Sequence, residues 1–235
     1  MDDNSYLNSV CFNNQPAKTL CTLLVIIAVL VVLHLCTGLV AYFNDVPWAL
    51  DLYFVFNVGS DQSIPTHFAV SAWLVSAGLA LKLSRKTGNA ATVQRGWKII
   101  AYVSLFLSVD ELAMFHERLT GPFRRFFGTE GYLWYAWVIP YGIGVIIIFL
   151  VLTKFLLSQP RKIGGLLILS GVIFVAGAVG FEMVGADMVF RGEEKGIPYR
   201  LIFTIEETLE MVGVSVFIYT LLLSLQLNTE KTLDR

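Results

Sequence analysis

Six long apolar runs constrain this chain more than any other feature of its sequence. They cover roughly residues 20–43, 65–83, 97–117, 132–157, 163–190 and 199–227. Each run can span a membrane, because about 20 helical residues cross a hydrocarbon layer of about 30 Å. A hydrophobic content of 56% and a mean hydropathy of +0.68 agree with this interpretation. We therefore predict an all-α, polytopic integral membrane protein with six transmembrane helices, which form a single helical-bundle domain over residues 1–235.

The connector after the first run contains one further apolar segment. Residues 47–56 are rich in aromatic side chains but too few to span the membrane. Such a segment is typical of an interfacial or re-entrant helix with aromatic anchors. Ser63 and Pro65 then mark the start of the second span, because serine is a favoured N-cap and proline is favoured in the first turn.

Lysine and arginine are distributed unevenly between the connectors. Most of the 17 basic residues lie on the side of the second connector, the fourth connector and the C-terminal tail. The basic residues on the opposite side are Arg118, Arg124, Arg125, Arg191, Lys195 and Arg200. The positive-inside rule then predicts that both termini are cytoplasmic, and we expect a bacterial inner (plasma) membrane protein surrounded by membrane lipid. The net charge of −1 gives no basic surface, so we expect no nucleic-acid partner.

Acidic residues inside the runs gather at one depth. The third run ends in an acidic segment, the fifth carries Glu182 and Asp187 in its outer part, and the sixth opens with three acids. With the predicted orientation, all of them lie in the extracytoplasmic half, and the site candidates among them are Asp110, Glu111, Glu117, Glu182, Glu206, Glu207 and Glu210. A charged group at the bilayer centre costs at least about 2.5 kcal/mol on insertion scales. We therefore predict that these side chains line one buried polar site.

Helix phase predicts how these residues face one another. On a continuous third helix, Asp110 and Glu117 lie about 20° apart, with Glu111 to one side and His116 on the other. On the sixth helix, Glu206 and Glu210 lie about 40° apart and can chelate one cation. We expect both stripes to face one cavity with Glu182 between them. Oxygens from the three helices should then lie within about 5 Å of a common point.

Simpler interpretations exist for several of these groups. Acids on the sixth run are also compatible with a solvated helix start, where the helix dipole favours them. His34 and His67 lie at the same depth as the acids, but a histidine in a span commonly bonds to the neighbouring backbone. We expect Asp187 to pair with Arg191 or Arg200 rather than to join the site.

The residue types at this depth favour a metal site. Imidazole and carboxylate without thiolate suit Fe, Mn or Zn, and the excess of carboxylate suits two ions. Glu111 and Glu207 are the candidates for general acid and base, because carboxyl groups buried among like charges can exchange a proton. The predicted metal ligands are Asp110, His116, Glu117, Glu182, Glu206 and Glu210, with His67 and His34 as additional candidates.

Three classes of function fit this pattern. The first is a membrane-embedded, metal-dependent enzyme that hydrolyses or oxidises a lipid or small amphiphile in the outer half of the membrane. The second is a cation- or proton-coupled transporter, because acids inside a membrane commonly mark ion paths. Against it, the inner halves of the runs offer mainly hydroxyl groups, and the sequence has no apparent inverted repeat. The third is an accessory membrane subunit whose polar cluster fixes helix packing.

Overall fold

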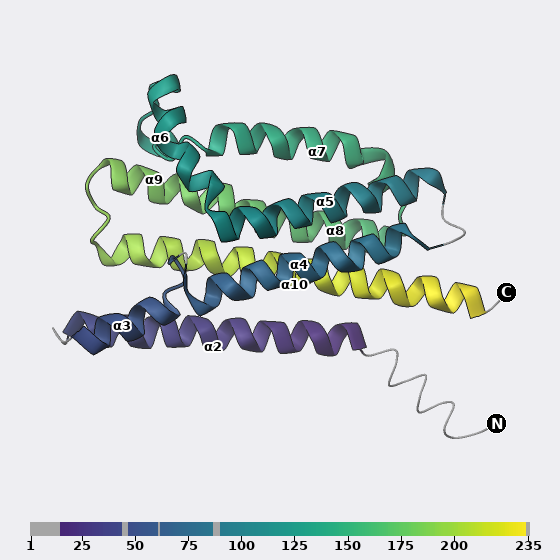
Figure 1. Cartoon of the computed structure of the whole chain (residues 1–235), viewed down its shortest axis with the longest axis horizontal. Helices are drawn as coiled ribbons and strands as arrows, with labels where there is room; N and C mark the ends of the chain where they lie inside the picture. The colour runs from purple at the N-terminus through teal and green to yellow at the C-terminus, as the bar shows by residue number, and fades with distance from the viewer. Residues whose placement is uncertain (1–14, 44–46, 61, 87–89, 234–235) are drawn as a thin grey trace, which may run out of the picture.

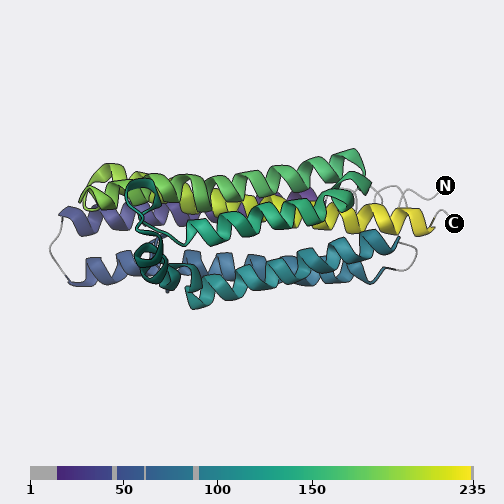
Figure 2. The ribbon, with the colours of Figure 1, turned by 90° about the horizontal axis from the view of Figure 1, so that it is seen from above.

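The computed structural model describes residues 15–43, 47–60, 62–86 and 90–233, and its regular elements in these ranges are all helical. Figures 1 and 2 show the long helices running side by side along one axis. The all-α prediction is confirmed for this part of the chain. The elements are α2 (Gln15–Phe43), α3 (Pro47–Phe56), α4 (Ile64–Ser84), α5 (Ala91–Ala113), α6 (Phe115–Phe127), η1 (Gly131–Leu133), α7 (Val138–Ser158), α8 (Arg161–Val175), η2 (Ala176–Phe181), α9 (Glu182–Phe190) and α10 (Ile197–Leu233).

Five helical segments of the described chain are long and apolar enough to cross a membrane. They are α2, α4, α7, α10 and the continuous segment formed by α8, η2 and α9. The pair of α5 and α6 passes the same test only as one bent unit, so the count is five or up to six. Large apolar side chains such as Ile146, Leu150 and Val172 are exposed on the outside of the bundle, as expected of helices that face lipid.

The predicted third span does not continue straight to Glu117. Helix α5 ends at Ala113, Met114 adopts a left-handed φ of 55°, and α6 leaves at an angle of 79°. A left-handed residue other than glycine costs about 1–2 kcal/mol, so contacts around the bend must hold it. The Arg118 N–H donates to the Met114 carbonyl at 3.1 Å. The sequence has neither glycine nor proline at residues 113–115, which is why its apolar pattern predicts a straight helix.

Helix α6 projects at one end of the bundle, beside the start of α7 and over α9 (Figure 1). It ends at Phe127, and its C-cap residue Gly128 has a φ of 62° and donates its N–H to the Arg124 carbonyl. The Arg124 guanidinium sits 3.9 Å from the centre of the Trp134 ring. The chain between α5 and α7 is therefore largely helical rather than an open connector. As a result, the fourth span begins at Val138 and not at the predicted residue 132.

The fifth span contains a short π-helical segment, η2, directly before Glu182. Its Gly177 packs against α10 so closely that a Cβ there would lie 2.7 Å from the Glu206 carbonyl oxygen. Likewise, a Cβ on Gly213 of α10 would lie 2.8 Å from the Phe174 nitrogen. Small residues thus let the two backbones touch, and this close approach places Glu182 beside the acidic start of α10.

A dry core occupies the end of the bundle where α2 begins and α10 finishes. Trp97 and Phe155 stack edge to face there, with ring centres 4.9 Å apart. Gly96 lies directly under the Phe155 ring, which leaves no room for a Cβ. The buried residues of this core come from α4, α5, α7, α8 and α10. In a membrane, close van der Waals packing of such side chains holds helices together, because lipid offers no hydrophobic driving force between them.

Candidate functional site

A cavity of about 640 Å³ opens at the opposite end of the bundle, where α3, α6 and α9 lie. We call this space the carboxylate cavity, because eight acidic residues line it: Asp110, Glu111, Glu117, Glu182, Glu194, Glu206, Glu207 and Glu210. Among the described lining residues, the basic ones are His116 and Arg200. All the acids except Glu194 were predicted from the sequence as site residues.

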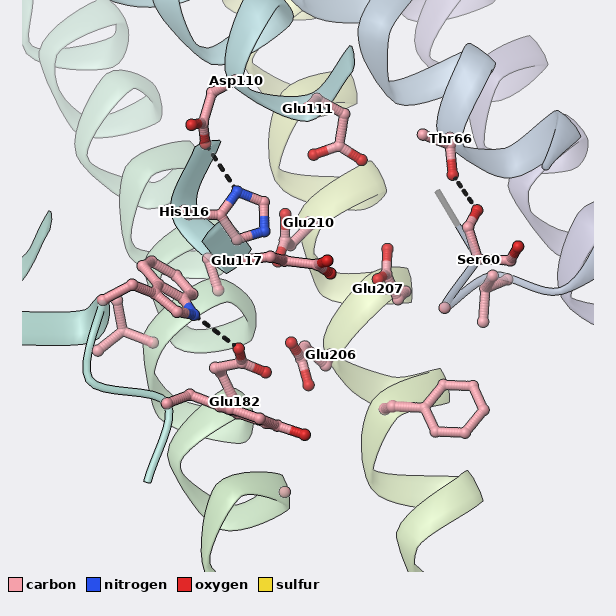
Figure 3. Close-up of a pocket in the computed structure, with 18 of the residues that line it drawn as sticks. Ser60, Thr66, Asp110, Glu111, His116, Glu117, Glu182, Glu206, Glu207 and Glu210 are labelled. Carbon is pink, nitrogen blue, oxygen red and sulfur yellow. Dashed lines mark hydrogen bonds and ion pairs between the residues drawn. The ribbon is translucent and has the colours of Figure 1, made fainter. Parts of the chain in front are cut away.

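Four helices bring seven of these acids and His116 together, and Glu194 lies in the turn between α9 and α10. Helix α5 ends in Asp110 and Glu111, α6 starts with His116 and Glu117, α9 starts with Glu182, and α10 supplies its three glutamates. Figure 3 shows the carboxyl groups of Glu111, Glu117, Glu207 and Glu210 directed into one shared space. The residues that the sequence placed at one depth therefore also face one cavity.

Asp110 is buried and holds His116 in place. Its Oδ2 atom accepts a hydrogen bond from His116 Nδ1 at 2.8 Å, and its Oδ1 atom accepts one from the Tyr141 hydroxyl at 2.6 Å. The imidazole therefore carries a proton on Nδ1 and presents Nε2 to the cavity (Figure 3). A carboxylate in this position fixes the tautomer and the orientation of a histidine ligand.

The helix-phase argument for the third run is wrong at this point. It placed Asp110 and Glu117 in one stripe and His116 on the other side. The bend at Met114 separates Asp110 from Glu117 into two helices and turns His116 back onto Asp110 instead. Because both Asp110 oxygens have partners, its geometry fits an orienting role better than the predicted ligand role.

Trp137 belongs to the cavity, although the aromatic run that contains it is typical of an interfacial belt. The indole Nε1–H donates to Glu182 Oε1 at 2.9 Å, and the ring lies 4.9 Å from the His116 ring. Glu182 in turn points toward Glu206 (Figure 3). A buried tryptophan N–H needs an acceptor, and this requirement is the signal that could have linked Trp137 to the half-buried Glu182. For Tyr141 the sequence contains no comparable signal.

Two tyrosine hydroxyls lie together in the lining of the cavity. The hydroxyl oxygens of Tyr135 and Tyr199 are 3.5 Å apart. Burial, followed by the hydrogen bond with Tyr199, raises the pKa of Tyr135 well above its usual range. Tyr135 therefore stays protonated and serves as a neutral hydrogen-bonding group beside the acids.

His34 and His67 do not line the cavity, so the expectation that they would join the site needs correction. His34 is 3% exposed; its Nδ1 accepts the Val58 N–H at 3.4 Å, and its Nε2 lies 3.2 Å from the Thr204 hydroxyl. His67 Nδ1 donates to the carbonyl of Ser63, the N-cap of its own helix, at 2.7 Å. Both follow the simpler interpretation, in which a histidine satisfies nearby backbone and hydroxyl groups. Asp187 pairs with Arg191 at 2.9 Å, as predicted.

The acids surround the cavity rather than converge on one atom. Within the described part of the chain, no three His, Cys, Asp or Glu side chains have the spacing of metal ligands. The expected common point within about 5 Å is therefore not formed by these side-chain positions. Two like charges 4 Å apart cost about 4 kcal/mol at an effective dielectric constant of 20, so the cavity needs cations or protons for charge balance.

A second, apolar cavity of about 990 Å³ adjoins the carboxylate cavity. It lies among α4, α5, α7, α8 and α10, and its described lining residues include no Asp, Glu, His, Lys or Arg. The two cavities share lining residues: Trp73, Leu107, Tyr141, Val145, Phe174, Val175 and Val179. Its lining includes exposed residues such as Ile146 and Val172, so the polar site is joined to an apolar space that opens on the outer surface of the bundle.

Residues 22–225 match the family described as Domain of unknown function (DUF8692). Because the match covers most of the chain, the protein belongs to this family. No curated protein and no solved structure matches the chain.

Proposed function

We propose that this member of the DUF8692 family is a membrane-embedded, metal-dependent enzyme that acts on a lipid or small amphiphile. The observation that carries the proposal is the carboxylate cavity, to which four helices contribute acids beside an oriented histidine. Buried acids are costly, and this many exceed what helix packing requires. The adjoining apolar cavity supports a substrate that enters from the membrane.

The donor set of the cavity fits a first-row metal ion. Carboxylate oxygens and one imidazole nitrogen suit Fe, Mn or Zn, and two ions would balance more of the negative charge. The groups that would hold the metal are His116 Nε2 and the carboxylates of Glu117, Glu182, Glu206 and Glu210. Glutamate side chains can rotate, so their spacing in this structure does not prevent them from approaching an ion together. A bound ion would supply Lewis acidity or, as Fe or Mn, redox chemistry.

The remaining polar groups have supporting roles in the proposal. Glu111 and Glu207 face the same space and would transfer protons as general acid and base. Asp110 would keep the His116 Nδ1 proton in place, which leaves Nε2 free to bind. Trp137 would hold the Glu182 carboxylate through its N–H.

The proposed orientation places both termini in the cytoplasm of a bacterial cell and the carboxylate cavity at the outer face of the inner membrane. It counts α5 with α6 as one of six spans. The uneven distribution of Lys and Arg supports it. Single cysteines at Glu130 and Arg161, in a background without native cysteines, should label from opposite faces of intact cells. Labelling of both from one face would overturn the orientation.

Metal analysis tests the proposed function. Protein purified in mild detergent should contain one to two Fe, Mn or Zn ions per chain by elemental analysis. Glu206→Gln with Glu210→Gln should lose them, whereas Asp187→Asn should keep them. Asp187 is a matched control because it lies at the same end of the bundle but pairs with Arg191 and does not line the cavity. Wild-type protein that binds none of these metals would overturn the proposal.

A cation- or proton-coupled transporter is the second candidate function, supported by acids inside helices that can span a membrane. A path across the membrane would have to continue past the apolar cavity. The hydroxyls of Ser76 and Ser170 instead donate to carbonyls of their own helices at 2.8 and 2.9 Å. Proteoliposomes with an internal pH or metal dye distinguish the two functions, because the transporter moves ions and the enzyme does not.

A further inference from the structure

We infer that the apolar cavity binds the alkyl chain of an amphiphile whose positively charged head group lies in the carboxylate cavity. The inference rests on the proposed function in that it names the substrate class of that same site. It concerns the binding step alone and can be measured without turnover.

The two cavities form one continuous site with a polar and an apolar end. Tyr141 marks the boundary, because it lines both cavities and its hydroxyl donates to Asp110 at 2.6 Å. Trp73 and Phe174 line both cavities as well, with ring centres 5.0 Å apart. One molecule that occupied both spaces would pass these three rings and would need a polar head and an apolar tail.

The apolar cavity has open room for a chain. Its volume of about 990 Å³ lies at the upper end of the range of about 300–1,000 Å³ for small-molecule sites. Glycines create part of this space: a Cβ on Gly144, Gly171 or Gly180 would meet no other atom within 4 Å. The wall is otherwise built from aliphatic and aromatic residues such as Ile100, Phe149 and Leu167. A hydrocarbon chain suits such a surface, and a hydrated head group does not.

The charge of the carboxylate cavity selects the head group. Eight acids face two basic side chains and stay in excess even with two divalent metal ions bound, so an ammonium group is favoured over a phosphate group. The rings of Trp137 and Tyr141 also line this cavity, and aromatic faces attract ammonium ions. Both features would distinguish a long-chain amine from the phospholipids that surround the protein. We therefore assign the site to single-chain amphiphiles with an amine head.

Quenching of tryptophan fluorescence measures this binding. Protein in phosphatidylcholine nanodiscs is titrated with a long-chain primary amine that carries bromine on its chain, and separately with the matching alkyl phosphate. Bromine beside Trp73 quenches its fluorescence, and Trp73→Phe identifies that component. Saturable quenching by the amine is expected, with the phosphate at least about tenfold weaker. Equal quenching by both head groups would overturn the head-group assignment.

Two glycine variants on α7 test the position of the chain. Gly144→Leu places a side chain in the apolar cavity and should weaken quenching by the amine about tenfold. Gly142→Leu is the control, because its Cβ also meets open space but it lines neither cavity. Wild-type binding in the first variant, or equal loss in both while metal content is unchanged, would contradict the assignment.

The metal content of the same samples separates this inference from the proposed function. Metal-free wild-type protein that still binds the amine would refute the metal-dependent enzyme and leave the amphiphile site standing. Metal-loaded protein without saturable quenching at Trp73 would refute the amphiphile site and leave the metal proposal standing.

Discussion

The two ends of the bundle use the same helices in opposite ways. At one end, Trp97 and Phe155 are 1% and 2% exposed and the helices leave no room beside Gly96. At the other end, α5, α9 and α10 surround a cavity of about 640 Å³ lined with acids. Close packing stabilises a fold, whereas gathered like charges reduce stability and are retained for function. Substitutions at the two ends should therefore change different properties.

The largest expected effect is at the packed end. Phe155→Ala should lower the free energy of unfolding by about 3–5 kcal/mol, because it leaves a cavity against Trp97. Thermal denaturation in detergent measures the loss. Ile147→Ala on the same helix is the control, since Ile147 is 55% exposed. The folded fraction of Phe155→Ala should still bind metal. Similar losses of stability for both variants would remove the contrast between the two ends.

Metal addition should stabilise the cavity end. At a metal concentration of 100 Kd, metal-free wild-type protein should gain about 2.7 kcal/mol of unfolding free energy. Glu206→Gln with Glu210→Gln should gain none, yet it should be at least as stable as wild type without metal because repulsion is relieved. Denaturation curves with and without metal measure both effects. A double variant that is much less stable than wild type without metal would show that these acids serve packing.

Asp110 should act through His116. Asp110→Asn should lower metal affinity by about 10- to 100-fold, because the amide no longer fixes the imidazole tautomer. Isothermal titration gives the affinity, and the imidazole tautomer can be followed by nitrogen NMR of labelled histidine. Unchanged affinity together with a changed tautomer would show that His116 does not bind the metal.

The smallest effect concerns the indole of Trp137. Trp137→Phe removes one hydrogen bond to Glu182, which is worth about 0.5–1.5 kcal/mol. Metal affinity should fall by at most about tenfold. Trp134→Phe is the matched control, because Trp134 stacks with Arg124 and does not line the cavity. An equal loss of metal affinity in both variants would show that Trp137 does not act through its hydrogen bond to Glu182.

The sequence predicts the helices, and the position of each acid along them, better than it predicts which side chains face one another. Apolar length gives the helices, and the chain direction through each one gives the depth of Glu182 and Glu206. The bend at Met114 has no local signal, since the Asp110–His116 contact across it forms only in the folded chain. His34 illustrates the same limit: its depth was predicted, but its packing against Thr204 and Val58 depends on how three segments meet.

X-ray absorption at the metal edge tests the central claim most directly. Protein purified with its native metal should show oxygen and nitrogen ligands at about 2.0–2.2 Å and the outer-shell scattering of one imidazole. His116→Gln should remove the imidazole signal, and Asp187→Asn should leave it unchanged. A spectrum with sulfur ligands, or an imidazole signal that persists in His116→Gln, would contradict metal binding in the carboxylate cavity.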